Sequence, residues 1–158
     1  MQRNECSATD LIFEEIIELV QAYSSRLSVL DESFVKEKPS SESWSIQQVV
    51  GHLIDSAANN HQRFVRAQTG ESLVFPKYNQ NHWIHAQNYD SCSWQQLIEF
   101  WRMYNFHLAH VIRQIPDEKM RVKCTITPSE PVSLSFLIED YVAHLKHHIN
   151  KINERASL

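Results

Sequence analysis

The sequence predicts an all-α domain built as a four-helix bundle. Four long stretches repeat apolar residues at helical spacing. The chain has only two glycines, Gly51 and Gly70, which is too few for many tight hairpins or for a phosphate-binding loop. Its five prolines all lie outside the periodic stretches. A length of 158 residues and a hydrophobic content of 42% fit one packed domain over residues 1–158.

The four stretches have recognisable beginnings. They predict helices over residues 7–30, 45–68, 93–115 and 133–154. The residues suited to cap the first three helices are Ser7 or Thr9, Ser45 and Ser93. Gln48 follows Ser45 by three residues and can complete a capping box. Pro116 ends the third helix.

Two of the connections are long. Residues 71–91 are expected to be irregular, and loops of this length in a compact bundle often hold function. Residues 122–131 alternate apolar and polar side chains at Val122, Cys124 and Ile126, which favours a short extended segment. Connections of this length permit a topology other than simple up-down-up-down.

Composition excludes several classes of protein. The net charge is −4, and no basic run is interleaved with aromatic residues, so nucleic-acid binding is not expected. No apolar run is long enough for a membrane span, and residues 1–6 lack the apolar core of a signal peptide. Cys6, Cys92 and Cys124 form no metal-binding or disulfide pattern and are given no role. We expect a reduced, cytoplasmic protein.

Two histidines of the fourth helix lie on its apolar face. On a helical wheel His148 is about 20° and His144 about 60° from the centre of the apolar stripe, whereas His147 faces outward at about 120°. Two inward imidazoles four residues apart can bind one metal ion. Alternatively, both rings are hydrogen-bonded core residues, because two histidines at this spacing do not by themselves establish a metal site.

A third imidazole on the second helix strengthens the metal interpretation. His52 lies about 100° from Leu53 on the wheel, at the flank of the apolar stripe and therefore at a boundary between helices. With His144 and His148 it would supply three neutral nitrogen ligands and leave a position open to water or substrate. Three histidines suit Zn, Ni, Fe or Mn.

The sequence around these histidines resembles the DinB/YfiT-like superfamily of metal-dependent enzymes. The resemblance is carried by WSIQQVVGHLIDS at residues 44–56 and HLKHHINKI at residues 144–152, and is supported by FPKYNQNHW at 75–83 and EPVSLSFLIEDY at 130–141. It implies a four-helix bundle with a long crossover connection, often dimeric. It also implies a metal triad of His52, His144 and His148.

The resemblance leaves the reaction open. Some members of the family transfer a low-molecular-weight thiol such as bacillithiol, mycothiol or glutathione, and others resemble hydrolases or isomerases. One divalent metal ion, a small-molecule substrate, a thiol cosubstrate and a homodimer are therefore expectations. Arg63 and Arg66 could contribute to a site for such a thiol. The alternative is a noncatalytic, dimeric or ligand-binding bundle with structural histidines.

Several other residues have two interpretations each. His107 could be a fourth ligand, although packing between helices is favoured. Asp140 could orient His144 or complement the helix dipole. Asp55 points away from the apolar face, which favours a surface salt bridge. Ser56 and Asn59 could line a pocket beside His52 or act as small spacers.

The aromatic and histidine residues outside the triad are expected to be structural. His110 points outward, and loop residues His82 and His85 are expected to be exposed to solvent. The residues expected to fill core positions more often than bind substrate are Trp44, Tyr78 and Trp83. No ExxH motif and no GxSxG motif occurs, which argues against a di-iron site and a serine nucleophile.

Overall fold

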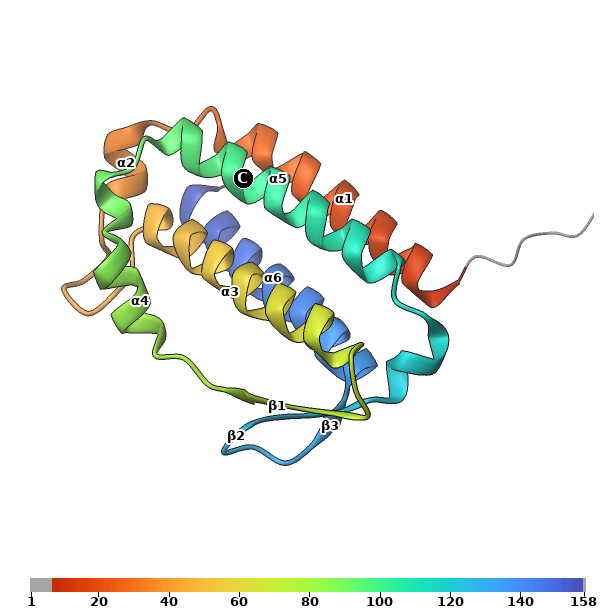
Figure 1. Ribbon diagram of the computed structural model, residues 1–158. Helices are drawn as coiled ribbons and strands as arrows, with labels where there is room; N and C mark the ends of the chain where they lie inside the picture. The colour runs from red at the N-terminus through yellow and green to blue at the C-terminus, as the bar shows by residue number, and fades with distance from the viewer. Residues whose placement is uncertain (1–6, 158) are drawn as a thin grey trace, which may run out of the picture.

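Four long helices form the bundle in this computed structural model, which describes residues 7–157. They are α1 (Ala8–Leu27), α3 (Ile46–Ala67), α5 (Trp94–Arg113) and α6 (Leu134–Ala156) (Figure 1). The shorter elements are α2 (Glu32–Lys36), α4 (Gln80–Gln87), the 3-10 turns η1 (Tyr89–Ser91) and η2 (Asp117–Arg121), and the strands β1 (Ser72–Pro76), β2 (Lys123–Thr127) and β3 (Val132–Ser133). The predicted all-α four-helix bundle is confirmed.

Local capping sets where the long helices begin. Ser7, rather than Thr9, is the N-cap of α1 and forms a capping box with Asp10. Ser45 and Gln48 form the predicted capping box at the start of α3. The first helix ends at Leu27, earlier than the predicted residue 30, because a turn follows and Asp31 caps the separate helix α2.

One connection between the long helices crosses the length of the bundle. Figure 1 shows α1 beside α5 in one layer and α3 beside α6 in the other. Helix α3 also packs on α5, and these two helices run in the same direction. The connection from α3 to α5, through β1 and α4, therefore runs back along the length of the bundle, which confirms the predicted long crossover.

The segments between the long helices carry a small sheet that the sequence predicted only in part. The predicted extended segment is β2, but residues 71–91 are not irregular, since they contain β1, α4 and η1. Strand β1 pairs in parallel with β2, from Ser72 opposite Lys123 to Pro76 opposite Thr127, and β3 pairs antiparallel with β2. The hydrogen-bonding partner of β1 is far along the chain, so residues 71–91 alone gave no sign of the strand.

Helix α3 is the central helix of the bundle. It contacts α5, α6, α4 and η1, so most of its surface is buried. Unusually for a buried helix, it carries many buried polar side chains: Gln47, Gln48, His52, Asp55, Ser56, Asn59 and Asn60. Buried polar groups need partners or a function, so this helix is where a site is to be sought.

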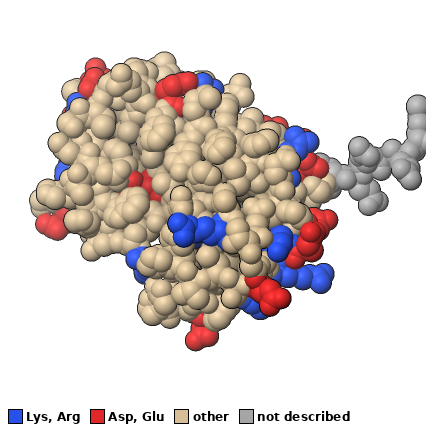
Figure 2. All heavy atoms as spheres, viewed as in Figure 1, with Lys and Arg blue, Asp and Glu red and all other residues tan. Residues whose placement is uncertain are grey.

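The outer surface carries mixed charge. Figure 2 shows Lys, Arg, Asp and Glu side chains interspersed on one face, with broad areas of other residues between them. Within residues 7–157, the helices are too short or too polar to cross a bilayer.

Candidate metal centre

Three imidazoles meet between α3 and α6. His52 comes from α3, and His144 and His148 come from successive turns of α6. The Nε2 atom of His144 lies 3.1 Å from Nε2 of His52 and 3.1 Å from Nε2 of His148. His52 is 1% exposed, and the other two rings are half-buried. The structure thus brings together the three histidines that the sequence singled out.

The spacing of the three rings suits a single metal ion. Ligand nitrogens around a tetrahedral ion stand about 3.3 Å apart when the metal–nitrogen bonds are about 2.0–2.1 Å long. The two Nε2–Nε2 distances of 3.1 Å are close to that value. Ligand atoms of all three residues lie within 4.8 Å of one another. The residues present therefore fit a divalent ion without rearrangement of the helices.

The electrostatics of the site also suit a metal ion. Burial, with the neighbouring His144, lowers the pKa of His52 to about 4. Burial and the surrounding histidines lower the pKa of His148 to about 3, and burial lowers the pKa of His144 as well. The three rings are consequently neutral near pH 7, which is the form of imidazole that binds metal.

The second ring nitrogens differ in their surroundings. Nδ1 of His144 lies 3.4 Å from Oγ of Ser56, one turn beyond His52 on α3. Nδ1 of His52 and Nδ1 of His148 are buried and have no hydrogen-bond partner among the described residues. Ser56, not Asp140, is therefore the residue placed to orient His144. Asp140 is exposed, and its charge partly offsets the effect of burial on the pKa of His144.

Two hollows reach the triad. One of about 390 Å³ is lined by His148 together with Trp44, Val49, Lys151 and Arg155. The ring of Trp44 is half-buried and also lies 4.9 Å from that of His52, so Trp44 forms a wall of the site rather than filling the core.

The second hollow, of about 230 Å³, opens at His144. Its polar lining from α3 consists of Ser56, Asn60 and Arg63. Other polar residues of its lining are Lys77, Tyr78, Gln80, Ser129 and Asp140. Ser56 thus lines a pocket beside the triad, which was one of the two interpretations drawn from the sequence. Asn59 instead donates a hydrogen bond to the backbone oxygen of Asp55 and has a structural role.

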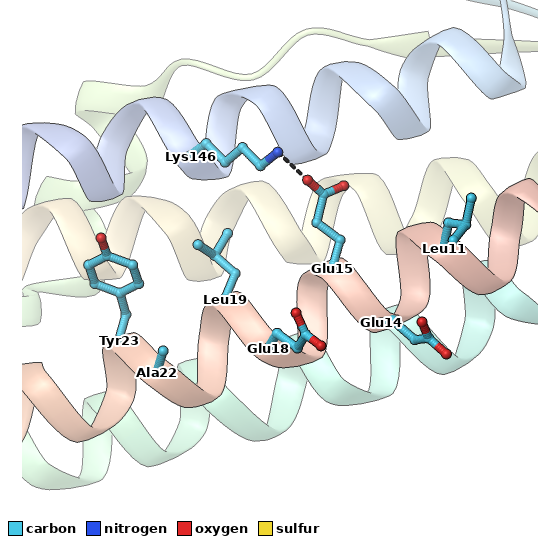
Figure 3. Close-up of a pocket in the computed structure, with 8 residues that line it drawn as sticks. All are labelled: Leu11, Glu14, Glu15, Glu18, Leu19, Ala22, Tyr23 and Lys146. Carbon is cyan, nitrogen blue, oxygen red and sulfur yellow. Dashed lines mark hydrogen bonds and ion pairs between the residues drawn. The ribbon is translucent and has the colours of Figure 1, made fainter.

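A larger hollow of about 630 Å³ lies elsewhere, along α1 (Figure 3). Its lining is Leu11, Glu14, Glu15, Glu18, Leu19, Ala22, Tyr23 and Lys146. Lys146 forms an ion pair with Glu15 across the gap between α6 and α1. This hollow contains no imidazole or thiol and includes none of the three histidines, so it is not part of the candidate metal centre.

The prediction for Asp55 was wrong. Its side chain is 1% exposed rather than on the surface. Oδ1 of Asp55 accepts hydrogen bonds of 2.5 Å from the Tyr89 hydroxyl and 2.7 Å from Nε2 of Gln87. The polar side of α3 is covered by α4 and η1, which the sequence did not predict as folded elements. Burial raises the pKa of Asp55, although its two hydrogen bonds oppose that effect.

The histidines outside the triad do not join it. His107 is exposed, and its ring lies 5.1 Å from that of His61 on the neighbouring helix. This contact agrees with packing between helices rather than a fourth ligand. As predicted, the exposed histidines include His82, His85, His110 and His147, although the first two lie on helix α4 rather than in an irregular loop.

The remaining sequence candidates are peripheral. Tyr78 and Trp83 are half-buried and pack on each other at 5.0 Å, at the surface rather than in the core. Arg66 is exposed and bonds Gln62. Cys124 is buried, Cys92 is half-buried, and Cys6 lies outside the described residues.

Known proteins are similar to this chain in sequence or in fold. The putative metal-dependent hydrolase of Oceanobacillus iheyensis is 24% identical over 142 residues, which cover 87% of this chain and 82% of that protein. The structure of YfiT from Bacillus subtilis, described as a probable metal-dependent hydrolase with an unusual four-helix bundle topology, superimposes with a TM-score of 0.85. The match has 21% identity and covers 99% of this chain and 91% of that one.

A second solved structure extends the comparison. The mycothiol-dependent maleylpyruvate isomerase superimposes with a TM-score of 0.71 and 16% identity, over 94% of this chain and 62% of that one. At these identities the two structures establish the fold alone. The model of the DinB superfamily matches residues 16–152, a span that includes all three histidines. The sequence match and the shared bundle together show that this chain belongs to the DinB superfamily.

Proposed function

We propose that this protein is a divalent-metal-dependent enzyme that acts on a small molecule, with His52, His144 and His148 as the metal ligands. The observation that carries the proposal is the convergence of three Nε2 atoms from two helices, at distances that suit one ion. Burial keeps the three rings neutral and ready to bind.

The donor set fits a catalytic rather than a closed structural ion. Within residues 7–157, the group of potential ligands has three members, and catalytic zinc sites characteristically have three protein ligands and one open position. A divalent ion there supplies Lewis-acid chemistry, stabilising negative charge on an oxygen or sulfur group. The chain's own residues hold the ion, and Ser56 orients His144.

Hydrolysis is the reaction that the comparisons support best. The Oceanobacillus iheyensis relative and YfiT are both described as metal-dependent hydrolases. Both hollows beside the triad are small, about 390 and 230 Å³, which suits a small-molecule substrate rather than a polymer.

Thiol transfer is a second candidate, favoured by a separate observation. One hollow reaches the triad at His148 and another at His144, so two molecules could approach the same centre. Group transfer between a thiol and an electrophilic substrate requires that arrangement. A fold neighbour described as mycothiol-dependent is consistent with it.

Elemental analysis of protein purified without chelators tests the proposal. We expect about one divalent ion per wild-type chain, identified as Zn, Ni, Fe or Mn, and loss of that ion in alanine variants of His52, His144 and His148. His147→Ala is the matched control, because His147 is exposed beside the triad. Wild-type activity in hydrolysis and thiol-transfer screens should disappear with the ion.

Two results would contradict the proposal. Absence of metal in the wild type, even after incubation with each ion, would favour a noncatalytic bundle with structural histidines. Equal metal content in wild type and His148→Ala would place the ion somewhere else.

A further inference from the structure

Arg63 lines the hollow beside His144 and has a hydrogen-bond donor without a partner among the described residues. Its side chain lines that hollow from α3. The Nε atom is buried and has no hydrogen-bond partner among the described residues, whereas Nη1 donates to Oδ1 of Asn60 over 3.3 Å. The guanidinium lies 5.4 Å from the ring centre of Phe75, which supports one face of its plane. Leaving a charged donor buried without an acceptor is costly.

The charge of Arg63 is not neutralised by a direct ion pair. The ion pairs formed among residues 7–157 do not include it. Burial lowers the pKa of Arg63, whereas the nearby Tyr78 and Asp140 act in the opposite direction. The lining of the hollow carries two cationic side chains, Arg63 and Lys77, against the single carboxylate of Asp140. The hollow thus has an excess of positive charge.

A chain of contacts leads from Arg63 to the triad. Ser56, Asn60 and Arg63 stand four and then three residues apart on α3, so they lie on one face of the helix. Nη1 of Arg63 donates to Asn60, Nδ2 of Asn60 lies 3.4 Å from Oγ of Ser56, and Oγ of Ser56 lies 3.4 Å from Nδ1 of His144.

The helix geometry limits the length of a bound molecule. Seven residues of α-helix span about 10 Å. The contact with Asn60 shows that the Arg63 side chain leans back toward the N-terminus of α3, so its guanidinium is nearer to Ser56 than that. A molecule held by Arg63 therefore needs to extend on the order of 10 Å to reach the centre.

We propose that Arg63 anchors a carboxylate of the molecule that reacts at the histidine centre, which makes that molecule a small carboxylic acid. The fork of Nε and an Nη nitrogen matches the two oxygens of a carboxylate. Lys77 adds positive charge at the rim. This inference rests on the proposed function for its chemistry, but the anchor itself can be measured without metal.

The test is an NMR titration of the Arg63 Nε–H resonance in metal-free protein with sodium acetate, against sodium chloride at equal ionic strength. We expect a saturable shift with acetate alone. Arg63→Met should weaken acetate binding, followed by backbone amide shifts, by at least about tenfold. Arg63→Lys keeps the charge but not the fork of nitrogens. Its affinity for acetate should lie between those of the wild type and Arg63→Met.

The matched control is Arg66→Met. Arg66 lies one turn further along the same helix, is exposed and already bonds Gln62, so this variant should bind acetate like the wild type. Circular dichroism establishes that each variant is folded. If Arg63→Met does not fold, Arg63→Lys and the wild-type Nε–H shift still decide the question.

Three outcomes would overturn the anchor. They are absence of a saturable shift, equal acetate affinity in wild type and Arg63→Lys or Arg63→Met, and saturation by inorganic phosphate but not by acetate. Metal content separates this inference from the proposed function, because Arg63→Met should keep the ion and His148→Ala should lose it while still binding acetate.

A final pair of probes identifies which reactant carries the carboxylate. Glutathione and S-methylglutathione share their carboxylates but differ in the free thiol. Stronger displacement of acetate by glutathione than by S-methylglutathione, seen only with metal bound, would support a carboxylate on a thiol cosubstrate. Acetate binding that glutathione does not disturb would support a carboxylate on the other substrate.

Discussion

His144 is the ring at which the contacts of the site meet. Its Nε2 atom faces the Nε2 atoms of His52 and His148, and its Nδ1 atom faces the hydroxyl of Ser56. A residue that touches the second nitrogen of a ligand fixes the tautomer and the orientation of the ring. Ser56 is therefore a positioning residue whose effect is on metal affinity.

Ser56→Ala should weaken metal binding by roughly tenfold, the lower end of the range for such partners, because the contact is long at 3.4 Å. Competition with a metal-binding dye measures the affinity. Ser25→Ala, an exposed position on α1, is the control. Unchanged affinity in Ser56→Ala would mean that His144 is oriented by the packing of α6 alone.

Asp55 should make stability depend on pH in an identifiable direction. Burial raises its pKa in the folded state above the ordinary 3.8. The folded protein therefore holds this proton more tightly than the unfolded chain does, so the contribution to stability is present below about pH 4 and is lost as the pH rises through the raised pKa.

Asp55→Asn keeps the acceptor for Tyr89 and Gln87 but cannot ionise. The free energy of unfolding of the wild type, relative to this variant, should therefore fall as the pH rises above 4. Urea denaturation at a series of pH values measures the difference. A wild type that gains stability relative to the variant over that range would show that the two hydrogen bonds outweigh burial.

At the scale of elements, the 3-10 turn η1 packs closely on α3 and covers part of its polar side. Gly51 makes the contact possible, since a Cβ atom there would lie 2.2 Å from Cδ2 of Tyr89. The hydroxyl of Tyr89 also donates a hydrogen bond to Asp55, which lies one turn after Gly51 on α3. The packing of this glycine and the hydrogen bond of this tyrosine therefore depend on each other.

Gly51→Ala should destabilise the fold by about 1–3 kcal/mol, although alanine normally favours a helix by about 1 kcal/mol over glycine. Thermal or urea unfolding measures the change. Gly70→Ala is the control, because its Cβ would meet nothing closer than 3.7 Å. A Gly51→Ala variant as stable as the wild type would mean that the Tyr89 ring moves aside without cost.

At the scale of the whole molecule, the candidate metal centre joins the two helices of one layer. An ion bound by His52 from α3 and by His144 and His148 from α6 binds the folded chain and not the unfolded one. Metal should therefore stabilise the protein by about 2.7 kcal/mol when the free ion is at a hundred times its Kd.

Thermal unfolding with and without zinc measures this effect. We expect the midpoint to rise with zinc, to return with a chelator, and to stay unchanged in His148→Ala. The same midpoint with and without zinc in the wild type would show that the ion does not bind at the junction of α3 and α6.

Local signals made much of this architecture predictable. The caps at Ser45 and Gln48 were correct because capping depends on residues three apart in sequence. The inward faces of His144 and His148 followed from helical periodicity. The strand β1 and the burial of Asp55 were not predictable, because each depends on partners supplied by segments that are distant in sequence, β2 for the strand and η1 for the carboxylate.

The sequence by itself therefore determined the four long helices, the family and the three histidines of the candidate metal centre, since periodicity and motif spacing are properties of short segments. Only the tertiary structure decided that Ser56 rather than Asp140 faces His144, that Asp55 is buried, and that the Nε–H of Arg63 lacks a partner beside the centre. Those facts depend on which helices pack together and which side chains cover them, and no single segment contains that information.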